Sequence, residues 1–392
     1  MPQQQTRCPS CAEPLDPEDD YCGACGLNVT GDVTEGSPGD VAGHVTGDGP
    51  SSAAAPEGVA PTAPRCVHCG SAELSADGYC ESCGGAQPRP RDHQELTADG
   101  VAGVTDRGLR HHRNEDAFTV AATQLPDGEP AVLAVVCDGV SSSARPDEAS
   151  AVAVEAAAAH LLTALQRGRR PDRAMREAIG EAARAVAELA KDGIRTPSGS
   201  QNAPACTYVS AISAAGLVTI GWVGDTRAYW IPDDRQSAVA YRLTEDDSWA
   251  ARVVAIGLMD EAEAYADPRA HAITGWLGAD AEEVEPHTVS FTPHVPGVLL
   301  VCTDGLWNYA EAAADLAERV RPDARAEPLA AARELVDFAV TAGGHDNITV
   351  AVLPISPPAE TTLRTVPLQS AAGAAPLHSS PTLQLHRPGS GS

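Results

Sequence analysis

Residues 298–307 read Val-Leu-Leu-Val-Cys-Thr-Asp-Gly-Leu-Trp, so that an uninterrupted apolar run leads into Asp304. A short continuous apolar run is typical of a strand that is buried on both faces. The same pattern occurs where Val-Leu-Ala-Val-Val-Cys precedes Asp138, and it occurs in reverse where Asp346 precedes Ile-Thr-Val-Ala-Val-Leu. The sequence therefore places three aspartates at the ends of three predicted strands.

Three acids at separate strand ends indicate a centre for hard cations. Carboxylate oxygens are ligands that select magnesium or manganese over zinc. Gly139 and Gly305 follow two of the acids, and a glycine lets the backbone and its carbonyl approach a bound ion. A single Asp-Gly pair after a strand is usually a turn, so this prediction depends on the repetition.

The chain is long enough for two or three domains, and its composition divides it into regions. Residues 98–355 alternate strand-like runs with Ala-rich stretches of helical spacing at 149–166 and 172–191. Residues 356–392 lack periodicity and are predicted to be a disordered tail. The regions are therefore expected as follows: a first cysteine-rich unit at 1–26, a flexible linker at 27–65, a second cysteine-rich unit at 66–85, a linker at 86–97, a large globular domain at 98–355 and a tail at 356–392.

The charge of the chain excludes several kinds of partner. Its 392 residues carry 27 Lys and Arg against 54 Asp and Glu, a formal charge of −27. Such a chain repels phosphate backbones and anionic lipid, so neither nucleic acid nor a membrane is an expected partner. The longest apolar runs, 131–137 and 298–302, are too short to span a bilayer, and residues 1–7 lack the apolar stretch of a signal peptide. We therefore expect a cytoplasmic protein.

Eight of the eleven cysteines form two similar units with the spacing C-x2-C-x10-C-x2-C. Two such pairs complete a tetrahedral zinc site, whereas a redox-active C-x-x-C motif would need a βαβ context that is absent here. Both units resemble zinc ribbons, and together they resemble a double zinc ribbon that binds two structural zinc ions. Such closed sites usually present a surface to a protein partner. The predicted zinc ligands are Cys8, Cys11, Cys22, Cys25, Cys66, Cys69, Cys80 and Cys83.

Residues 100–353 resemble the metal-dependent protein phosphatases of the 2C type, including their bacterial members. Six motifs occur in the family's order across about 250 residues, which makes a chance match implausible. They are Arg113-Asn114-Glu115-Asp116-Ala117, Asp138-Gly139-Val140, Val223-Gly224-Asp225-Thr226-Arg227-Ala228-Tyr229, Leu277-Gly278, Thr303-Asp304-Gly305-Leu306-Trp307 and His345-Asp346-Asn347-Ile348-Thr349.

The resemblance implies an α+β fold, an αββα four-layer sandwich with a site for two magnesium or manganese ions at one end. It implies that Asp138 bridges both ions, that the Gly139 carbonyl binds one of them, and that Asp304 and Asp346 complete the other. Two cations neutralise the charge of a phosphate monoester and acidify a water for in-line attack. By the same resemblance, the catalytic set also includes two acids that hold ion-bound waters, Glu115 and Asp116, and a weaker third-ion site at Asp225.

The chain departs from the family at the position that usually holds a phosphate-gripping arginine, where it has His111. The neighbouring Arg110 and Arg113 are the other candidates for binding phosphate. The turn after Gly139 is Val-Ser-Ser-Ser, so it lacks the histidine that some relatives are proposed to use as general acid. Asn308 occupies a position often held by a third-metal aspartate, which weakens the third site.

Four residues near these motifs have simpler interpretations. Arg227 either pairs with a carboxylate or contacts substrate. Trp307 is expected to pack beneath the site, and Asp246 and Asp247 are expected to form a solvated turn.

The leading hypothesis is a phosphoserine/phosphothreonine protein phosphatase that acts on phosphorylated proteins, with a Ser/Thr kinase as its signalling counterpart. The alternative is a scaffold, catalytically weak or inactive, whose phosphatase fold binds phosphoproteins without turning them over. The intact acids favour the enzyme, whereas His111 and the altered turn keep the scaffold open. A metal nuclease is disfavoured by the charge of −27.

Overall fold

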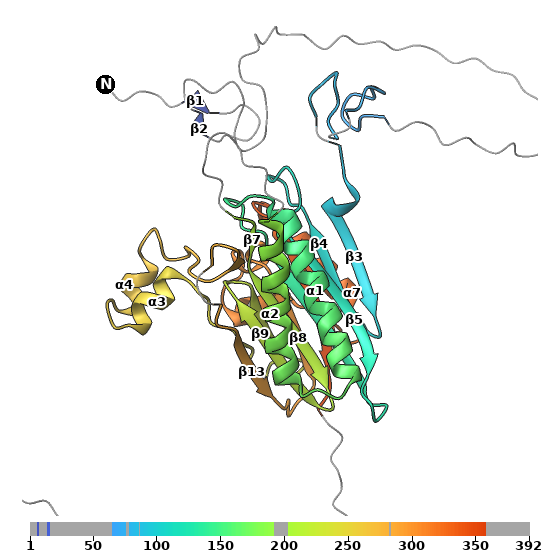
Figure 1. Ribbon diagram of the computed structural model, residues 1–392, viewed down its shortest axis with the longest axis vertical. Helices are drawn as coiled ribbons and strands as arrows, with labels where there is room; N and C mark the ends of the chain where they lie inside the picture. Colours follow the sequence, from blue (N-terminus) through green and yellow to red (C-terminus); the bar gives the residue numbers. More distant parts are fainter. Residues whose placement is uncertain are drawn as a thin grey trace, which may run out of the picture. The chain divides into compact units, whose positions relative to one another are not determined.

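The computed structural model describes residues 65–75, 78–85, 87–191, 203–281 and 284–357, together with the short paired strands β1 (Thr6–Arg7) and β2 (Pro14–Leu15). Two large sheets, antiparallel throughout, form the catalytic domain (Figure 1). Helices cover the outer face of each sheet, which gives the expected α+β layer order of helix, sheet, sheet and helix.

The first sheet has six strands and the second has five. In spatial order the six-stranded sheet consists of β11 (Tyr241–Arg242), β10 (Arg227–Pro232), β14 (Gly297–Cys302), β15 (Ile348–Ile355), β4 (Val101–Asp106) and β3 (His93–Ala98). The five-stranded sheet consists of β13 (His287–Phe291), β9 (Leu217–Val223), β8 (Tyr208–Ala214), β6 (Pro130–Cys137) and β5 (Ala117–Gln124). A separate short pair consists of β7 (Ala205–Cys206) and β12 (Leu277–Gly278).

Two long helices lie side by side over the five-stranded sheet, α1 (Pro146–Gln166) and α2 (Pro171–Leu189) (Figure 1). The outer face of the six-stranded sheet is covered by α5 (Asp304–Trp307), α6 (Ala313–Arg319) and α7 (Pro328–Ala342). A small helical pair with its own apolar contacts consists of α3 (Trp249–Ala255) and α4 (Glu261–Tyr265). A 3₁₀ turn, η1 (Pro90–Asp92), precedes β3.

Strand β6 shows why its run is apolar without interruption. Leu133 and Cys137 pack under the helices α1 and α2, whereas Ala134 and Val136 pack in the core between the two sheets. Successive side chains of a strand point to opposite faces, and here both faces are buried. Asp138 follows at the end of this strand, where the two sheets end.

The predicted strands and helices are confirmed. The runs at 131–137, 217–223, 298–302 and 348–353 form β6, β9, β14 and β15, and the Ala-rich stretches form α1 and α2.

The predicted linker 86–97 is wrong in its second half, because His93–Ala98 is the edge strand β3. Most of its side chains are exposed, so it lacks the apolar pattern that identifies an inner strand. The four cysteines of the first predicted ribbon lie outside the described residues, as do most of the linker 27–65 and of the tail.

Helix α1 has the length and composition of a membrane-spanning segment, and among the described helices it alone does. Its buried positions, which include Ala153, Ala157 and Leu161, belong to the core beneath the helix layer. Packing on the sheet therefore accounts for its apolar character.

A pair of glycine substitutions tests the packing that fixes α5. A Cβ added at Gly305 would lie 2.0 Å from the carbonyl oxygen of Asn347, whereas a Cβ at Gly180 in α2 meets nothing within 4 Å. We expect Gly305→Ala to destabilise the domain by about 1–3 kcal/mol through overpacking. Gly180→Ala should stabilise it by about 0.5–1 kcal/mol through helix propensity. Urea unfolding measures both, and equal effects of the two substitutions would contradict this account.

Candidate metal centre and active site

The three aspartates at strand ends come from both sheets. Asp138 follows β6 of the five-stranded sheet, whereas Asp304 follows β14 and Asp346 precedes β15 in the six-stranded sheet. Burial raises the pKa of Asp304 to about 7, with a further contribution from the charge of Asp346. Burial and the charges of neighbouring acids, including Asp304 and Asp346, also raise the pKa of Asp138 well above its usual range. The fold therefore gathers the predicted ion ligands into one acidic site.

Asp116 adds a fourth, deeper carboxylate. Its Oδ2 accepts hydrogen bonds from Thr349 Oγ1 at 2.6 Å and Thr303 Oγ1 at 3.0 Å, and burial raises its pKa to about 8. Its Oδ1 is buried without a hydrogen-bond partner, and so is Oδ1 of Asp304. Because buried polar atoms are normally paired, two unpaired carboxylate oxygens fit a site that is completed by cations.

The acidic site is looser than a closed set of ligands around a single ion. In the described residues, one group of three or more candidate ligand atoms lies within 4.8 Å of one another, and it consists of the cysteines 66, 69, 80 and 83. The carboxylates of the acidic site are spaced more widely than this. One reason is that Asp346 has another partner, since His111 Nε2 lies 3.1 Å from its Oδ1.

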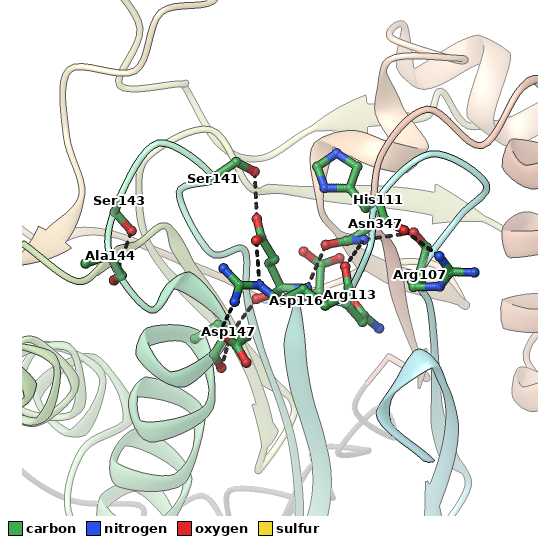
Figure 2. A network of polar contacts seen from close by, with 12 residues as sticks. Arg107, His111, Arg113, Asp116, Ser141, Ser143, Ala144, Asp147 and Asn347 are labelled. Atoms are coloured by element: carbon green, nitrogen blue, oxygen red, sulfur yellow. Dashed lines mark hydrogen bonds and ion pairs between the residues drawn. The ribbon is translucent and has the colours of Figure 1, made fainter. Parts of the chain in front are cut away.

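Glu115 is held from two sides. Arg113 Nε donates to its Oε1 at 2.9 Å and Ser141 Oγ donates to its Oε2 at 2.7 Å (Figure 2). Ser141 belongs to the Val-Ser-Ser-Ser turn after Gly139, where this chain departs from the family pattern. The sequence offered no signal for its role, because Ser141 reaches Glu115 across 26 residues of chain.

Asn347 fastens the loop that carries the phosphate-binding candidates. Its Oδ1 accepts from the backbone N of Glu115 at 2.6 Å, and its Nδ2 donates to the carbonyl oxygens of Arg107 and Arg113 at 2.8 and 3.1 Å. Figure 2 shows Asn347 between Arg107 and Arg113. The motif His345-Asp346-Asn347 contained this residue, but the role of the amide became visible only in the structure.

The three candidates for phosphate binding differ in whether their side chains already form ion pairs with acids. His111 pairs with Asp346, and Arg113 pairs with Glu115 and, at 3.5 Å, with Asp147. Arg110 is exposed.

Gly139 leaves no room for a side chain. A Cβ at this position would lie 2.5 Å from the carbonyl oxygen of Pro146 and 2.8 Å from that of Glu115. The close packing ties the turn after Asp138 to the start of α1.

Asp225 lies beside the acidic site, and burial together with the charge of Asp304 raises its pKa to about 8. Trp307 Nε1 donates to the carbonyl oxygen of Asp225 at 3.0 Å, and the guanidinium of Arg227 stacks 3.5 Å from the Trp307 ring centroid.

The prediction that Asp246 lies in a solvated turn is wrong. Asp246 is buried, and both of its oxygens accept from Arg227, at 2.6 and 3.0 Å.

This buried pair settles the role of Arg227, which binds a carboxylate. It also explains why Asp246 is buried, because a guanidinium that is fully enclosed requires a charged partner. The neighbouring Asp247 accepts from Gly224 N and from His287 Nε2, both at 2.8 Å. Asn308 Nδ2 donates to Asp304 Oδ2 at 3.2 Å.

The four cysteines of the second unit lie together. The four sulfur atoms lie within 4.8 Å of one another, and none is in a disulfide. Cys66 Sγ lies 3.6 Å from Cys83 Sγ, and Cys69 Sγ lies 3.5 Å from Cys80 Sγ. Gln87 Nε2 approaches Cys66 Sγ at 3.3 Å. Four thiols at this spacing can hold one tetrahedral ion.

Comparison with known proteins places this fold in a family. The protein phosphatase 2C family model matches residues 108–338. A serine/threonine phosphatase, stp, of Listeria monocytogenes is 30% identical over 257 residues, which cover 63% of this chain and 92% of the relative. The crystal structure of the Mycobacterium tuberculosis serine/threonine phosphatase PstP/Ppp has a TM-score of 0.53 at 25% identity and covers 65% of this chain and 98% of that chain.

A crystal structure of the catalytic domain of PstP in complex with two manganese ions shares the fold, with a TM-score of 0.50 at 23% identity over 65% of this chain and 98% of that chain. The fold and these comparisons define the chain as a phosphatase enzyme. It belongs to the protein phosphatase 2C family. The family match ends before Asp346, which the structure nevertheless brings to the acidic site.

The raised pKa values predict a pH dependence of the stability of the metal-free protein. In chelator, the folded state holds protons on Asp304 up to about pH 7 and on Asp116 up to about pH 8, whereas unfolded Asp titrates near pH 4. Between these values the folded state binds more protons. The stabilisation present at low pH is therefore lost progressively as the pH rises from about 4 to about 7 or 8.

We expect Asp304→Asn to make the melting temperature fall less steeply between about pH 5 and pH 8 than it does in the wild-type protein. Asp323→Asn, an exposed acid on the surface, is the control and should leave the slope unchanged. Parallel curves for wild type and Asp304→Asn would contradict the raised pKa.

Proposed function

We propose that this phosphatase hydrolyses phosphoserine and phosphothreonine in proteins, using two magnesium or manganese ions held by Asp138, Asp304 and Asp346. The observation that carries the proposal is the convergence of these acids from two sheets, with a buried Oδ1 of Asp304 that has no partner. The names of the relatives in Listeria and Mycobacterium support the substrate class, and the PstP complex supports manganese.

Each residue has a part in this proposal. Asp138, the Gly139 carbonyl, Asp304 and Asp346 would hold the two ions. When bound, the ions neutralise the phosphate and supply an acidified water as nucleophile. Glu115 is oriented by Arg113 and Ser141, so its carboxylate is fixed toward the waters around the ions.

Asp116 and Asp225 act at the margins of the site. The unpaired Oδ1 of Asp116 would accept a hydrogen bond from a water that the ions hold. Asp225 would hold a third ion only weakly, because Asn308 adds no negative charge and instead donates to Asp304.

The loop between Arg107 and Arg113, which is hydrogen-bonded to Asn347, would bind the phosphate. Arg110 has no partner among the described residues, whereas Arg113 is already paired with two acids. We therefore infer that Arg110 meets the phosphoprotein and that Arg113 chiefly orients Glu115. His111, which pairs with Asp346, would offer the phosphate a further hydrogen-bond donor.

The scaffold remains the second candidate, and one observation favours it. The pairing of His111 with Asp346 engages a predicted ligand oxygen at 3.1 Å, and an ion must compete with that pair. A site with weakened ion binding would retain phosphoprotein without turning it over.

Phosphate release from a phosphothreonine peptide separates the two candidates. With manganese we expect turnover that excess chelator stops and that Asp304→Ala reduces at least about 10³-fold, because the second ion loses a charged ligand. Asp323→Ala is the matched control and should keep the wild-type rate. Absence of turnover by folded wild-type protein that binds manganese would favour the scaffold.

We further propose that the four cysteines 66, 69, 80 and 83 bind one zinc ion and that the matching unit, Cys8, Cys11, Cys22 and Cys25, binds a second. The mutual approach of the four sulfurs supports the first of these sites. Closed sites of this kind shape a small surface, so the ribbons are proposed to bind a protein partner or to localise the enzyme. The proposed setting is the cytoplasm, with a Ser/Thr kinase that phosphorylates the same targets.

Zinc content tests the ribbons independently of catalysis. We expect wild-type protein, after removal of loosely bound ions, to contain two zinc ions per chain by elemental analysis. Cys66→Ser together with Cys69→Ser should reduce this to one, because two thiolates do not hold zinc in a closed site. Glu81→Ala, an exposed change in the same unit, should retain two. Folded wild-type protein that contains no zinc by elemental analysis would refute the ribbon assignment.

A further inference from the structure

Thr207 lies directly opposite Asp138, the acid proposed to bridge the ions. An isolated bridge pairs Gly139 with Cys206 and continues the register of β6 and β8 past the end of the sheet. The backbone N of Thr207 donates to the carbonyl oxygen of Asp138 at 2.8 Å. Thr207 and Asp138 are therefore cross-strand neighbours.

The two side chains share a face of the sheet. Residues opposite each other in an antiparallel pair point the same way, and neighbours along a strand alternate. Cys206 packs under the helices, whereas Val209, two residues beyond Thr207, packs between the sheets. Thr207 and Asp138 therefore both point between the sheets, where the acidic site lies.

The hydroxyl of Thr207 has no partner there. The residue is 3% exposed, and its Oγ1 is buried without a hydrogen bond. A buried, unpaired polar group lowers the stability of the folded state by about 1–3 kcal/mol. A hydroxyl at this position therefore calls for an explanation. A Cβ on Gly224 would lie 2.7 Å from Thr207 Cβ, so Thr207 also packs against the turn that carries Asp225. The unpaired hydroxyl thus belongs to a residue in contact with the backbone on either side of the proposed ion site.

We propose that Thr207 is a positioning residue of the cation site, whose hydroxyl donates a hydrogen bond to an oxygen of the ions' ligand shell. The inference rests on the proposed two-ion function. The buried hydroxyl has no partner in the protein, and an oxygen of the ligand shell would supply its acceptor. Thr207 thereby contributes to ion affinity, although it is not itself a ligand.

Thr207→Val tests this with two readouts, manganese binding by calorimetry and thermal unfolding in chelator. The substitution keeps the shape and removes the hydroxyl. In chelator we expect a melting temperature equal to or above that of the wild type, because an unpaired buried group is lost. Manganese affinity should fall roughly 10- to 100-fold, as on loss of other residues that orient metal ligands. Thr207→Ser should restore most of the affinity.

Thr219→Val is the matched control, because its Oγ1 is paired with Ser290 Oγ at 2.9 Å in a strand away from the acids. It should lower the melting temperature and leave manganese affinity unchanged. Wild-type affinity in Thr207→Val would overturn the inference alone. If wild-type protein binds no manganese and Asp304→Ala is indistinguishable from it, both the two-ion function and the role of Thr207 are refuted.

Discussion

Repulsion between carboxylates is the constraint on which the active site depends. Asp116, Asp138, Asp225 and Asp304 are gathered where two sheets end, and their burial and mutual charge raise the pKa of each. In the absence of cations, such a group is tolerated only by holding protons. The fold is therefore built to favour positive charge at this point, and the rest of the domain supplies the apolar packing that offsets its cost.

A small polar network holds the acids in place. Thr303, directly after β14, and Thr349, in the adjacent strand β15, both donate to Asp116, which directly precedes β5 of the other sheet. Thr349 in turn contacts Thr105 at 2.6 Å, and Asn114 Nδ2 donates to Thr105 at 2.9 Å. The core between the sheets is otherwise apolar, and at this end of it hydrogen bonds link the two sheets. The rigidity of the site comes from this network and from Asn347.

Much of the fold and of the acidic site could be predicted from the sequence, for a physical reason. A strand buried on both faces has a distinctive continuous apolar run, so β6 and β14 and the acids at their ends were visible, and the motif order indicated the family. Edge strand β3 was missed because an exposed strand has no such pattern.

Contacts between residues far apart in the chain also could not be predicted from the sequence. The burial of Asp246 depends on Arg227, and the contact of Ser141 with Glu115 depends on the fold that brings their loops together. Thr207 carried no motif that marked it. These residues are chemically ordinary in sequence, and only their partners, or the lack of one, reveal what they do.

The pairing of β4 with β15 has a consequence for the way the protein is made. Thr105 and Thr349 are hydrogen-bonded across 244 residues of sequence, and β15 is the last strand of the domain. Contacts of such long range form slowly, because the intervening chain must be closed into a loop first. On the ribosome, the six-stranded sheet stays open until β15 emerges, and Asp346 emerges just ahead of it. The catalytic domain therefore reaches its complete fold only late in synthesis, when the final strand is inserted.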